Sequence, residues 1–327
     1  MKVGKWSAII LVILSLSSWV PCGHAADRIT VSATQPTAFE WDLMVGREQG
    51  FFARENLEVE TTYMAPQLVI NALIAGQVYV AKSGTHFGLI AAARGADVRI
   101  IAGGIYGYPY DLISRPEFKS LVDLRGQKIA GASLASITTV VFKDLMARNG
   151  IPPSEYTLVF VGGSSERFQV LKSGQVAASL AENPPFNFQA TDSGDRVLLR
   201  YSEVVKDMQY VSYFATPKIA SANRPLMIRF LRAVVQSQRW LNDPENERRA
   251  IQILSQQLKS DERTASRSYR YLITESRAFR GEGKIDGPGL AEAIRLLAEN
   301  QMIPKKEPWE SFADPSFLSE VKTAGEK

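Results

Sequence analysis

The feature of the sequence that most constrains its fold is a short turn that occurs twice. The segment NALIAGQVYVA begins at Asn71, and the segment QVLKSGQVAAS begins at Gln169. In each, an apolar run of helical character ends in a small residue followed by Gly-Gln-Val. Glycine is the usual residue just beyond a helix, because it adopts the left-handed backbone conformation without steric cost. The repeat predicts two structural units of like construction.

The segments around each turn alternate between strand and helix patterns. Ile29, Val31 and Ala33 are spaced as in a half-buried strand, and Gly50 and Gly150 are placed to end helices. Such alternation predicts an α/β fold with parallel strands covered by helices. The other expected elements are helices over Thr37–Gln49, Leu68–Ala75, Ile137–Asn149 and Arg167–Lys172, and strands over Leu57–Tyr63, Lys128–Ala132 and Tyr156–Val161.

Two segments rich in glycine, proline and tyrosine are expected to connect the units. GGIYGYPYDLISRPEF lies between the two series, and QYVSYFATPK lies after the second. Two crossovers predict a two-strand hinge and one lobe built from discontinuous sequence. We expect lobe 1 to contain residues 26–110 and 214–327, with helices at the C-terminal end, and lobe 2 to contain residues 111–213.

The N-terminus carries the pattern of a secretory signal peptide. Lys2 and Lys5 precede an apolar run that ends near CGHAAD, and we expect cleavage after Ala25, which places the mature protein in the periplasm. The run is short for a membrane span. Lipidation of Cys22 is an alternative, although Pro21 is a poor substitute for the small residue expected before a lipidated cysteine.

Composition excludes several classes of function. Beyond the signal peptide the chain has no cysteine and a single histidine, His86. We therefore expect no disulfide, no thiolate catalysis, no Cys/His metal site and no cofactor. The 38 Lys and Arg nearly balance the 34 Asp and Glu, which does not favour a nucleic-acid or membrane-surface partner.

Five motifs in order resemble a known family. They are GREQGFFARENLEVE, ALIAGQVYVAKSG, AAARGADVRIIAG, SLVDLRGQKIAG and LKSGQVAASLAENPPF. The chain from about Arg28 to Ile219 is similar to periplasmic substrate-binding proteins of bacterial ABC importers, in the nitrate, sulfonate and taurine group that includes thiamine-pyrimidine-precursor binders. The resemblance implies a bilobal periplasmic-binding-protein fold of type II with two mixed sheets, a ligand between the lobes, closure on binding and delivery to a membrane permease.

The chain departs from that family after the repeated turn. Family members often carry an acidic residue there, whereas this sequence has Tyr79 and Ala177. The departure weakens any transfer of ligand identity but leaves the implied fold unaffected.

Four loops at the carboxyl ends of expected strands are the candidate binding site, because ligands of open parallel sheets bind there. They supply short hydroxyl donors, the single imidazole, aromatic rings and one acid, and the return crossover adds a tyrosine. The candidate ligand-binding residues are Gln35, Phe39, Trp41, Ser83, Thr85, His86, Ser133, Ser136, Thr138, Glu182, Asn183, Phe186 and Tyr213.

The third loop is suited to an anion. Ser133, Ser136 and Thr138 lie at or just before a helix N-terminus, where free N–H groups and the helix dipole favour negative charge. In the alternative interpretation, Ser136 only caps its own helix. His86 is as well explained by a structural role. We expect Arg167 to be an exposed first-turn residue, although it could also reach a ligand carboxylate.

The aromatic residues of these loops and crossovers suggest a pocket for a ring, although core packing explains any one of them as well. They are Phe39, Trp41, Tyr106, Tyr108, Tyr110, Phe186 and Tyr213.

The expected function is that of a monomeric solute receptor that binds a small organic anion. An aromatic or heterocyclic carboxylate is favoured over an aliphatic sulfonate. Two other classes remain open: an enzyme on the same fold, such as one that uses Ser83 and His86 with a remote acid, and a module that feeds a sensor.

Overall fold

The computed structural model describes residues 25–321, except 135, 206, 207 and 281. The expected signal peptide over residues 1–25, including Cys22, therefore lies outside the described residues but for Ala25. In the part of the chain that the structure describes, no helix has both the length and the apolar character needed to cross a bilayer.

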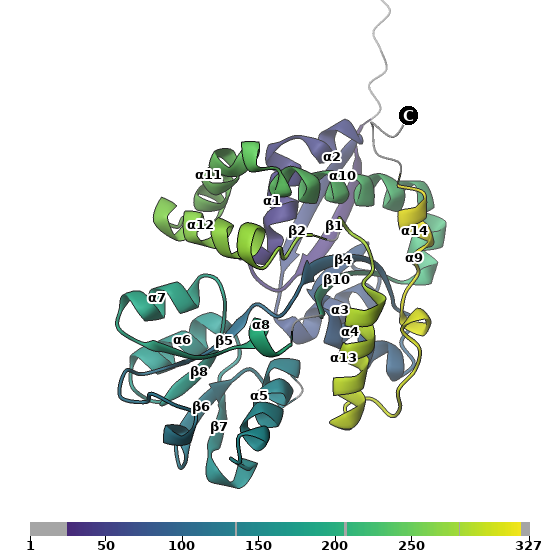
Figure 1. The fold of residues 1–327 in the computed structure, drawn as a ribbon. Coiled ribbons are helices and arrows are strands. Elements are labelled where there is room, and N and C mark those ends of the chain that lie inside the picture. The colour runs from purple at the N-terminus through teal and green to yellow at the C-terminus, as the bar shows by residue number, and fades with distance from the viewer. Residues whose placement is uncertain (1–24, 135, 206–207, 281, 322–327) are drawn as a thin grey trace, which may run out of the picture.

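Two five-stranded mixed sheets form the two lobes (Figure 1). Sheet A has the order β2-β1-β3-β10-β4, and sheet B has the order β7-β6-β8-β5-β9. The strands of sheet A are β1 (Asp27–Ala33), β2 (Leu57–Tyr63), β3 (Val80–Gly84), β4 (Arg99–Tyr106) and β10 (Gln209–Ala215). The strands of sheet B are β5 (Tyr110–Ser114), β6 (Lys128–Gly131), β7 (Thr157–Phe160), β8 (Ala178–Glu182) and β9 (Arg196–Arg200).

The two sheets have the same construction. In each, the first three strands in spatial order are parallel, and the fourth strand is antiparallel to both of its neighbours. The chain reaches that fourth strand directly from the other lobe. Strand β5 of sheet B follows β4 of sheet A, and strand β10 of sheet A follows β9 of sheet B and the short helix α8 (Tyr201–Val204). The lobes are thus joined by two crossovers, and the expected lobe boundary at 213/214 falls inside β10.

The repeated Gly-Gln-Val turn is one structural motif used twice. Gly76 and Gly174 have φ values of 72° and 75°, in the left-handed region. In the first copy the amide of Gln77 donates to the carbonyl of Ala72 at 3.0 Å, and in the second the amide of Gln175 donates to Val170 at 3.0 Å. These bonds satisfy carbonyls at the helix end. Each copy leads the chain into the central strand of its sheet, β3 or β8.

Helices cover both sheets, and those of the C-terminal part pack mainly on lobe 1 (Figure 1). The α-helices before the return crossover are α1 (Trp41–Glu48), α2 (Phe51–Arg54), α3 (Pro66–Ile74), α4 (Thr85–Ala93), α5 (Ile137–Arg148), α6 (Ser164–Lys172), α7 (Phe186–Asp192) and α8 (Tyr201–Val204). After it come α9 (Pro217–Ala222), α10 (Arg224–Asn242), α11 (Glu247–Leu258), α12 (Glu262–Tyr269), α13 (Gly287–Glu299) and α14 (Ser316–Ser319). The 3-10 helices are η1 (Ala38–Glu40), η2 (Val122–Leu124), η3 (Pro153–Glu155), η4 (Pro244–Asn246) and η6 (Trp309–Phe312), and η5 (Arg270–Glu275) is a π-helix.

Three expected helices differ from the observed ones at their N-terminal ends. The helix expected over Leu68–Ala75 begins two residues earlier, at Pro66. The helix expected over Thr37–Gln49 starts as η1 and continues as α1, because the Thr37 hydroxyl accepts from the amide of Phe39 and the Glu40 carboxylate folds back to Thr37 in a capping box. The helix expected over Arg167–Lys172 begins earlier, at Ser164. Arg167 is therefore one turn inside α6, where its side chain can be buried.

Candidate functional site

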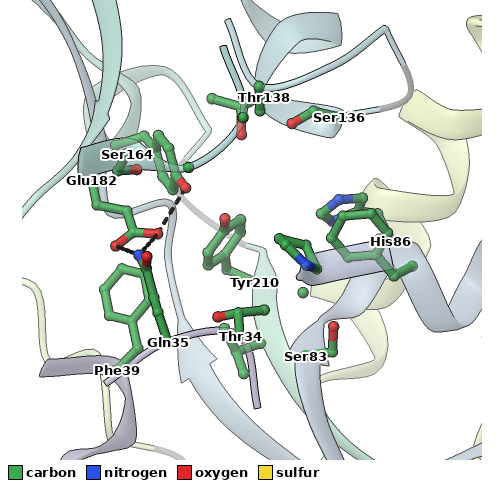
Figure 2. A pocket seen from close by; sticks show the side chains of 18 of the residues that line it. Thr34, Gln35, Phe39, Ser83, His86, Ser136, Thr138, Ser164, Glu182 and Tyr210 are labelled. Atoms are coloured by element: carbon green, nitrogen blue, oxygen red, sulfur yellow. Dashed lines mark hydrogen bonds between the residues drawn. The ribbon is translucent and has the colours of Figure 1, made fainter. Parts of the chain in front are cut away.

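A cavity of about 240 Å³ lies between the lobes, where the carboxyl ends of strands from both sheets meet. Lobe 1 contributes the segments after β1 and β3, and lobe 2 contributes the segments after β6, β7 and β8. Figure 2 shows the cavity with Ser136 and Thr138 along one edge and Thr34 and Ser83 along the other. The position agrees with the rule for ligands of open α/β sheets.

Eight of the thirteen candidate residues line this cavity. They come from all four of the loops selected from the sequence. The eight are Gln35, Phe39, Ser83, His86, Ser133, Ser136, Thr138 and Glu182.

The structure places Trp41 and Tyr213 away from the cavity, inside lobe 1. Trp41 is buried, and its indole N–H donates to the carbonyl of Ala250 at 3.2 Å. The hydroxyl of Tyr213 donates to Asp42 Oδ2 at 2.8 Å. Both side chains are held by the C-terminal helices or the core, which a reading of the loop sequence alone does not reveal.

Thr85, Asn183 and Phe186 also lie outside the cavity. The Thr85 hydroxyl pairs with that of Ser212 at 2.7 Å. The Asn183 amide donates to Asp111 Oδ2 at 2.9 Å, and Phe186 packs against the apolar cluster of lobe 2. The side chains of these three residues are thus held by contacts within one lobe and do not face the cavity.

Arg167 is the charged group that sequence reasoning placed wrongly. It is not exposed but 2% accessible, and it lines the cavity. Its guanidinium donates to the carbonyls of Leu180 and Gly162 and to the Ser164 hydroxyl, the first and last at 2.6 Å. Among the described residues it forms no ion pair with a carboxylate at 4.0 Å or less. This buried cation therefore has no carboxylate within ion-pair distance in the described part of the chain, and Glu182, whose carboxyl lines the same cavity, interacts with it only at longer range.

The N-terminal ends of two helices border the cavity on the lobe 2 side. Ser136 precedes α5, but its side chain makes no capping hydrogen bond, so the interpretation of Ser136 as a simple cap is wrong. Thr138 Oγ1 accepts from Tyr108 at 3.1 Å and keeps its own proton free to donate. Gly163 directly precedes α6 and Ser164 begins it, and both line the cavity. Unpaired N–H groups at helix starts favour negative charge. Both helix ends, like Arg167, therefore favour an anion in the cavity.

Two carboxyl groups also line the cavity. Glu182 Oε1 accepts from the Tyr110 hydroxyl at 3.1 Å, and Glu182 Oε2 accepts from Gln35 at 3.2 Å, a contact that joins the lobes (Figure 2). Burial raises the pKa of Glu182, and the positive charge of Arg167 acts in the opposite direction and lowers it. Burial likewise raises the pKa of Glu40 to about 7, against the lowering effect of Lys82. Protonation of such groups reduces the negative charge next to a bound anion.

Lys82 lines the cavity too, but its charge is compensated. Its ammonium group contacts Asp42 Oδ1 at 2.5 Å, and both side chains have no exposed area. Asp42 in turn accepts from Tyr213 at 2.8 Å and Gln238 at 3.0 Å. The lysine is therefore part of a buried network that ties β3 to α1, β10 and α10.

The lobe 1 wall carries polar groups without partners. Ser83 Oγ and both ring nitrogens of His86 are buried and have no hydrogen-bond partner among the described residues. Burial lowers the pKa of His86 to about 3, so the ring is neutral near pH 7 and offers one donor and one acceptor. Buried polar groups in native proteins are nearly always paired, and a ligand or water in the cavity would pair these.

Sequence reasoning missed four lining residues that shape the cavity: Glu40, Lys82, Tyr210 and Ser164. Tyr210 packs against Tyr108 in a tilted arrangement with ring centroids 4.9 Å apart, and edge to face against Tyr110 at 5.6 Å. Tyr210 lies at the start of the expected return crossover, beside aromatic residues already considered for the pocket, and this position could have identified it as a lining residue. Within the described residues, no group of three or more His, Cys, Asp or Glu is placed to hold a metal ion.

Several solved structures share this fold. The ligand-binding component of an ABC-type import system from Staphylococcus aureus, solved with zinc bound, has a TM-score of 0.76 and 15% identity, covering 91% of this chain and 100% of that one. The periplasmic aliphatic sulphonate-binding protein SsuA from Escherichia coli has a TM-score of 0.68 and 14% identity, covering 88% and 97%. The desulfurization enzyme DSZB has a TM-score of 0.68 and 14% identity, covering 90% and 98%.

These likenesses show that the fold is the bilobal periplasmic-binding-protein fold of type II. No curated protein matches the chain by sequence. The family model described as NMT1/THI5 like matches residues 41–247, which include all of lobe 2 and, in lobe 1, the strands β2, β3, β4 and β10. The chain therefore belongs to the NMT1/THI5-like family.

Proposed function

We propose that this protein is the extracytoplasmic solute-binding component of an ABC importer. It reaches the periplasm through the signal peptide over residues 1–25, binds a small organic anion between its lobes as a monomer, and delivers it to a membrane permease. The family and the fold support this role, because two of the structures similar to it are binding components by name. The two crossovers between the lobes supply the hinge that closure requires.

The observation that carries the proposal is the buried guanidinium of Arg167 at the cavity, which has no carboxylate within 4.0 Å among the described residues. A guanidinium taken out of water without a carboxylate is costly, and an anionic ligand would compensate it. Arg is the side chain best suited to bidentate recognition of an oxyanion. The starts of α5 and α6 support the same charge from the backbone.

The remaining lining suggests what the anion is attached to. Phe39, Phe87, Tyr110 and Tyr210 supply apolar and aromatic surface, which suits a ring. Glu182 lies beside them and can accept a hydrogen bond from a ring N–H or hydroxyl. We therefore favour an aromatic or heterocyclic carboxylate, with an aliphatic sulfonate as the second choice.

An enzyme on the same fold is the alternative, and DSZB shows that the fold can host one. The geometry gives it less support here. Ser83 Oγ makes no hydrogen bond to His86, and a pKa of about 3 makes the imidazole a weak base. A sensory role would use the same cavity and differs only in the downstream partner.

A thermal-shift screen with matched ligand pairs tests the proposal. Each aromatic or heterocyclic carboxylate is compared with its primary amide, which keeps the shape and removes the charge. A carboxylate at 100 times its Kd is expected to add about 2.7 kcal/mol to the free energy of unfolding. If amides and neutral heterocycles stabilise the protein while no anion does, the proposed ligand class is wrong.

Turnover separates the receptor from the enzyme. Each ligand that binds is incubated with the protein and analysed by mass spectrometry for a product. A receptor returns the ligand unchanged. Conversion that is lost in His86→Ala would instead establish the enzyme.

A further inference from the structure

A second cavity lies between lobe 2 and the C-terminal helices that pack on lobe 1. It consists of two hollows of about 330 and 170 Å³ that share the residues Arg200, Tyr271 and Glu275. Arg200 ends β9 of lobe 2, whereas Tyr271 and Glu275 belong to η5. In Figure 1, α12 lies above α7 in this region, and the ion pair between Arg267 and Asp192 joins the two helices at 2.6 Å.

This cavity opens on the face of sheet B opposite to the first one. Tyr110 lines the first cavity, and Asp111, the next residue of β5, accepts from Asn183, which lines the second. Successive residues of a strand point to opposite faces of the sheet. The side chain of Tyr110 therefore lies on the side of the first cavity, and that of Asp111 lies on the side of the second. The two cavities share no lining residue.

The smaller hollow is rich in positive charge. Arg200, Arg267 and Arg270 line it against a single acid, Glu275. Arg267 is engaged by Asp192, but among the described residues Arg200 and Arg270 form no ion pair at 4.0 Å or less. Two guanidinium groups without an ion pair among the described residues thus border one small space from different lobes. Burial raises the pKa of the neighbouring carboxyl of Asp111, and the charge of Arg200 acts in the opposite direction and lowers it.

Two buried polar atoms in the same hollow are unpaired. Asn183 is 1% exposed and Tyr271 is 9% exposed, and neither Asn183 Oδ1 nor the Tyr271 hydroxyl has a partner in hydrogen-bond geometry among the described residues. Burial raises the pKa of Tyr271, and the Ser202 hydroxyl lies near enough to act against that rise. The Asn183 amide nitrogen is occupied by Asp111, which leaves Oδ1 as an acceptor. The Tyr271 hydroxyl can donate. Buried polar groups in native proteins are nearly always paired, and a ligand or water in the hollow would pair these two.

We propose that this hollow is a second ligand site, for a small oxyanion that retains a hydroxyl group, as inorganic phosphate does. Arg200, Arg270 and the Tyr271 hydroxyl bind its oxygens, and its hydroxyl donates to Asn183 Oδ1. Because Arg200 belongs to lobe 2 and Arg270 to the helices on lobe 1, the anion bridges the lobes on the side opposite the first cavity.

Titration calorimetry of the full-length mature protein with inorganic phosphate tests the proposal. One phosphate is expected to bind, and Arg200→Gln and Arg270→Gln are each expected to weaken it by about tenfold or more. Both arginines are exposed, so these variants keep the fold. Arg248→Gln, which removes an exposed charge of α11 outside every cavity described here, is the matched control and leaves binding unchanged.

Three results would overturn the site. They are the absence of phosphate binding, an equal loss in Arg248→Gln, and a loss in Arg167→Gln while Arg270→Gln binds normally, which would place the phosphate in the first cavity. Sulfate, which has no hydroxyl near pH 7, is expected to bind more weakly, and equal binding would contradict the role of Asn183. Apart from the result that places phosphate in the first cavity, these outcomes do not bear on the organic ligand proposed there, so the two proposals can fail independently.

Discussion

Each lobe has one buried cation beside the interlobe cavity, and the two cations have different kinds of partner. In lobe 1, Lys82 is neutralised by Asp42 at 2.5 Å inside a network with Tyr213 and Gln238. In lobe 2, the partners of Arg167 among the described residues are two backbone carbonyls and a serine hydroxyl. The positive charge of Lys82 thus forms a stabilising ion pair, whereas that of Arg167 can pair with a ligand. The difference assigns the anion to the lobe 2 side of the cavity.

The largest expected effect concerns the compensated cation. Asp42→Ala leaves Lys82 buried without its counter-charge, and breaking a buried pair in this way costs about 3–5 kcal/mol of the free energy of unfolding. Urea denaturation measures the loss. Asp97→Ala, which removes an exposed pair with Arg99 at 3.7 Å, is the control and changes stability by about 0.5 kcal/mol or less. A similar small change in both variants would remove the distinction between the lobes.

The next effect concerns Glu40, a lobe 1 acid whose pKa burial raises to about 7 from 4.5. Between these values the unfolded chain releases the proton and the folded chain keeps it, so the free energy of unfolding falls as pH rises. The change attributable to Glu40 is on the order of 3 kcal/mol and levels off above pH 7. In Glu40→Gln this fall is absent.

Urea denaturation of both proteins from pH 4 to 8 checks this prediction. The stability of the wild type relative to Glu40→Gln should decline through that window. Parallel curves would mean that Glu40 is ionised in the fold like an exposed carboxylate. The lobe 1 wall would then carry a negative charge, and a cationic ligand group would have to face it.

The smallest effect concerns an unpaired hydroxyl of lobe 1. Ser83→Ala removes a buried group without a partner, so the ligand-free protein loses no stability, whereas ligand affinity falls about 2- to 10-fold. Ser32→Ala is the matched control, because that buried hydroxyl donates to the carbonyl of Val69 at 3.1 Å. The control is expected to lose about 1 kcal/mol of stability and no affinity. The reverse pattern would remove Ser83 from the ligand site.

The fold was largely predictable from sequence because its signals are local. Alternating apolar residues defined β1 and β2, and the Gly-Gln-Val turns located β3 and β8 through helix-end geometry that is encoded within six residues. The family motifs added the two-lobe arrangement. The strand β10 was assigned to the wrong lobe at its start, because membership in a sheet depends on distant partners.

The cavity was less predictable for the same reason. Its loops followed from the strand ends, but which side chain faces inward depends on tertiary contacts. Trp41 is hydrogen-bonded to Ala250 inside the core, and Tyr213 is hydrogen-bonded to Asp42. Both partners are far away in sequence. Arg167 was misplaced because α6 begins at Ser164, which moves the arginine one turn inside the helix and under the carbonyl of Leu180.

The most direct test of the central claim combines the charge of the ligand with the charge of Arg167. The affinities of the wild type and Arg167→Gln are measured by calorimetry for the best carboxylate and for its amide. The wild type is expected to prefer the carboxylate by about 10- to 100-fold, in line with about 1.5–3 kcal/mol for hydrogen bonds to a charged group. In Arg167→Gln that preference should disappear. An undiminished preference in the variant would show that the anion is not held by Arg167 and would contradict the account.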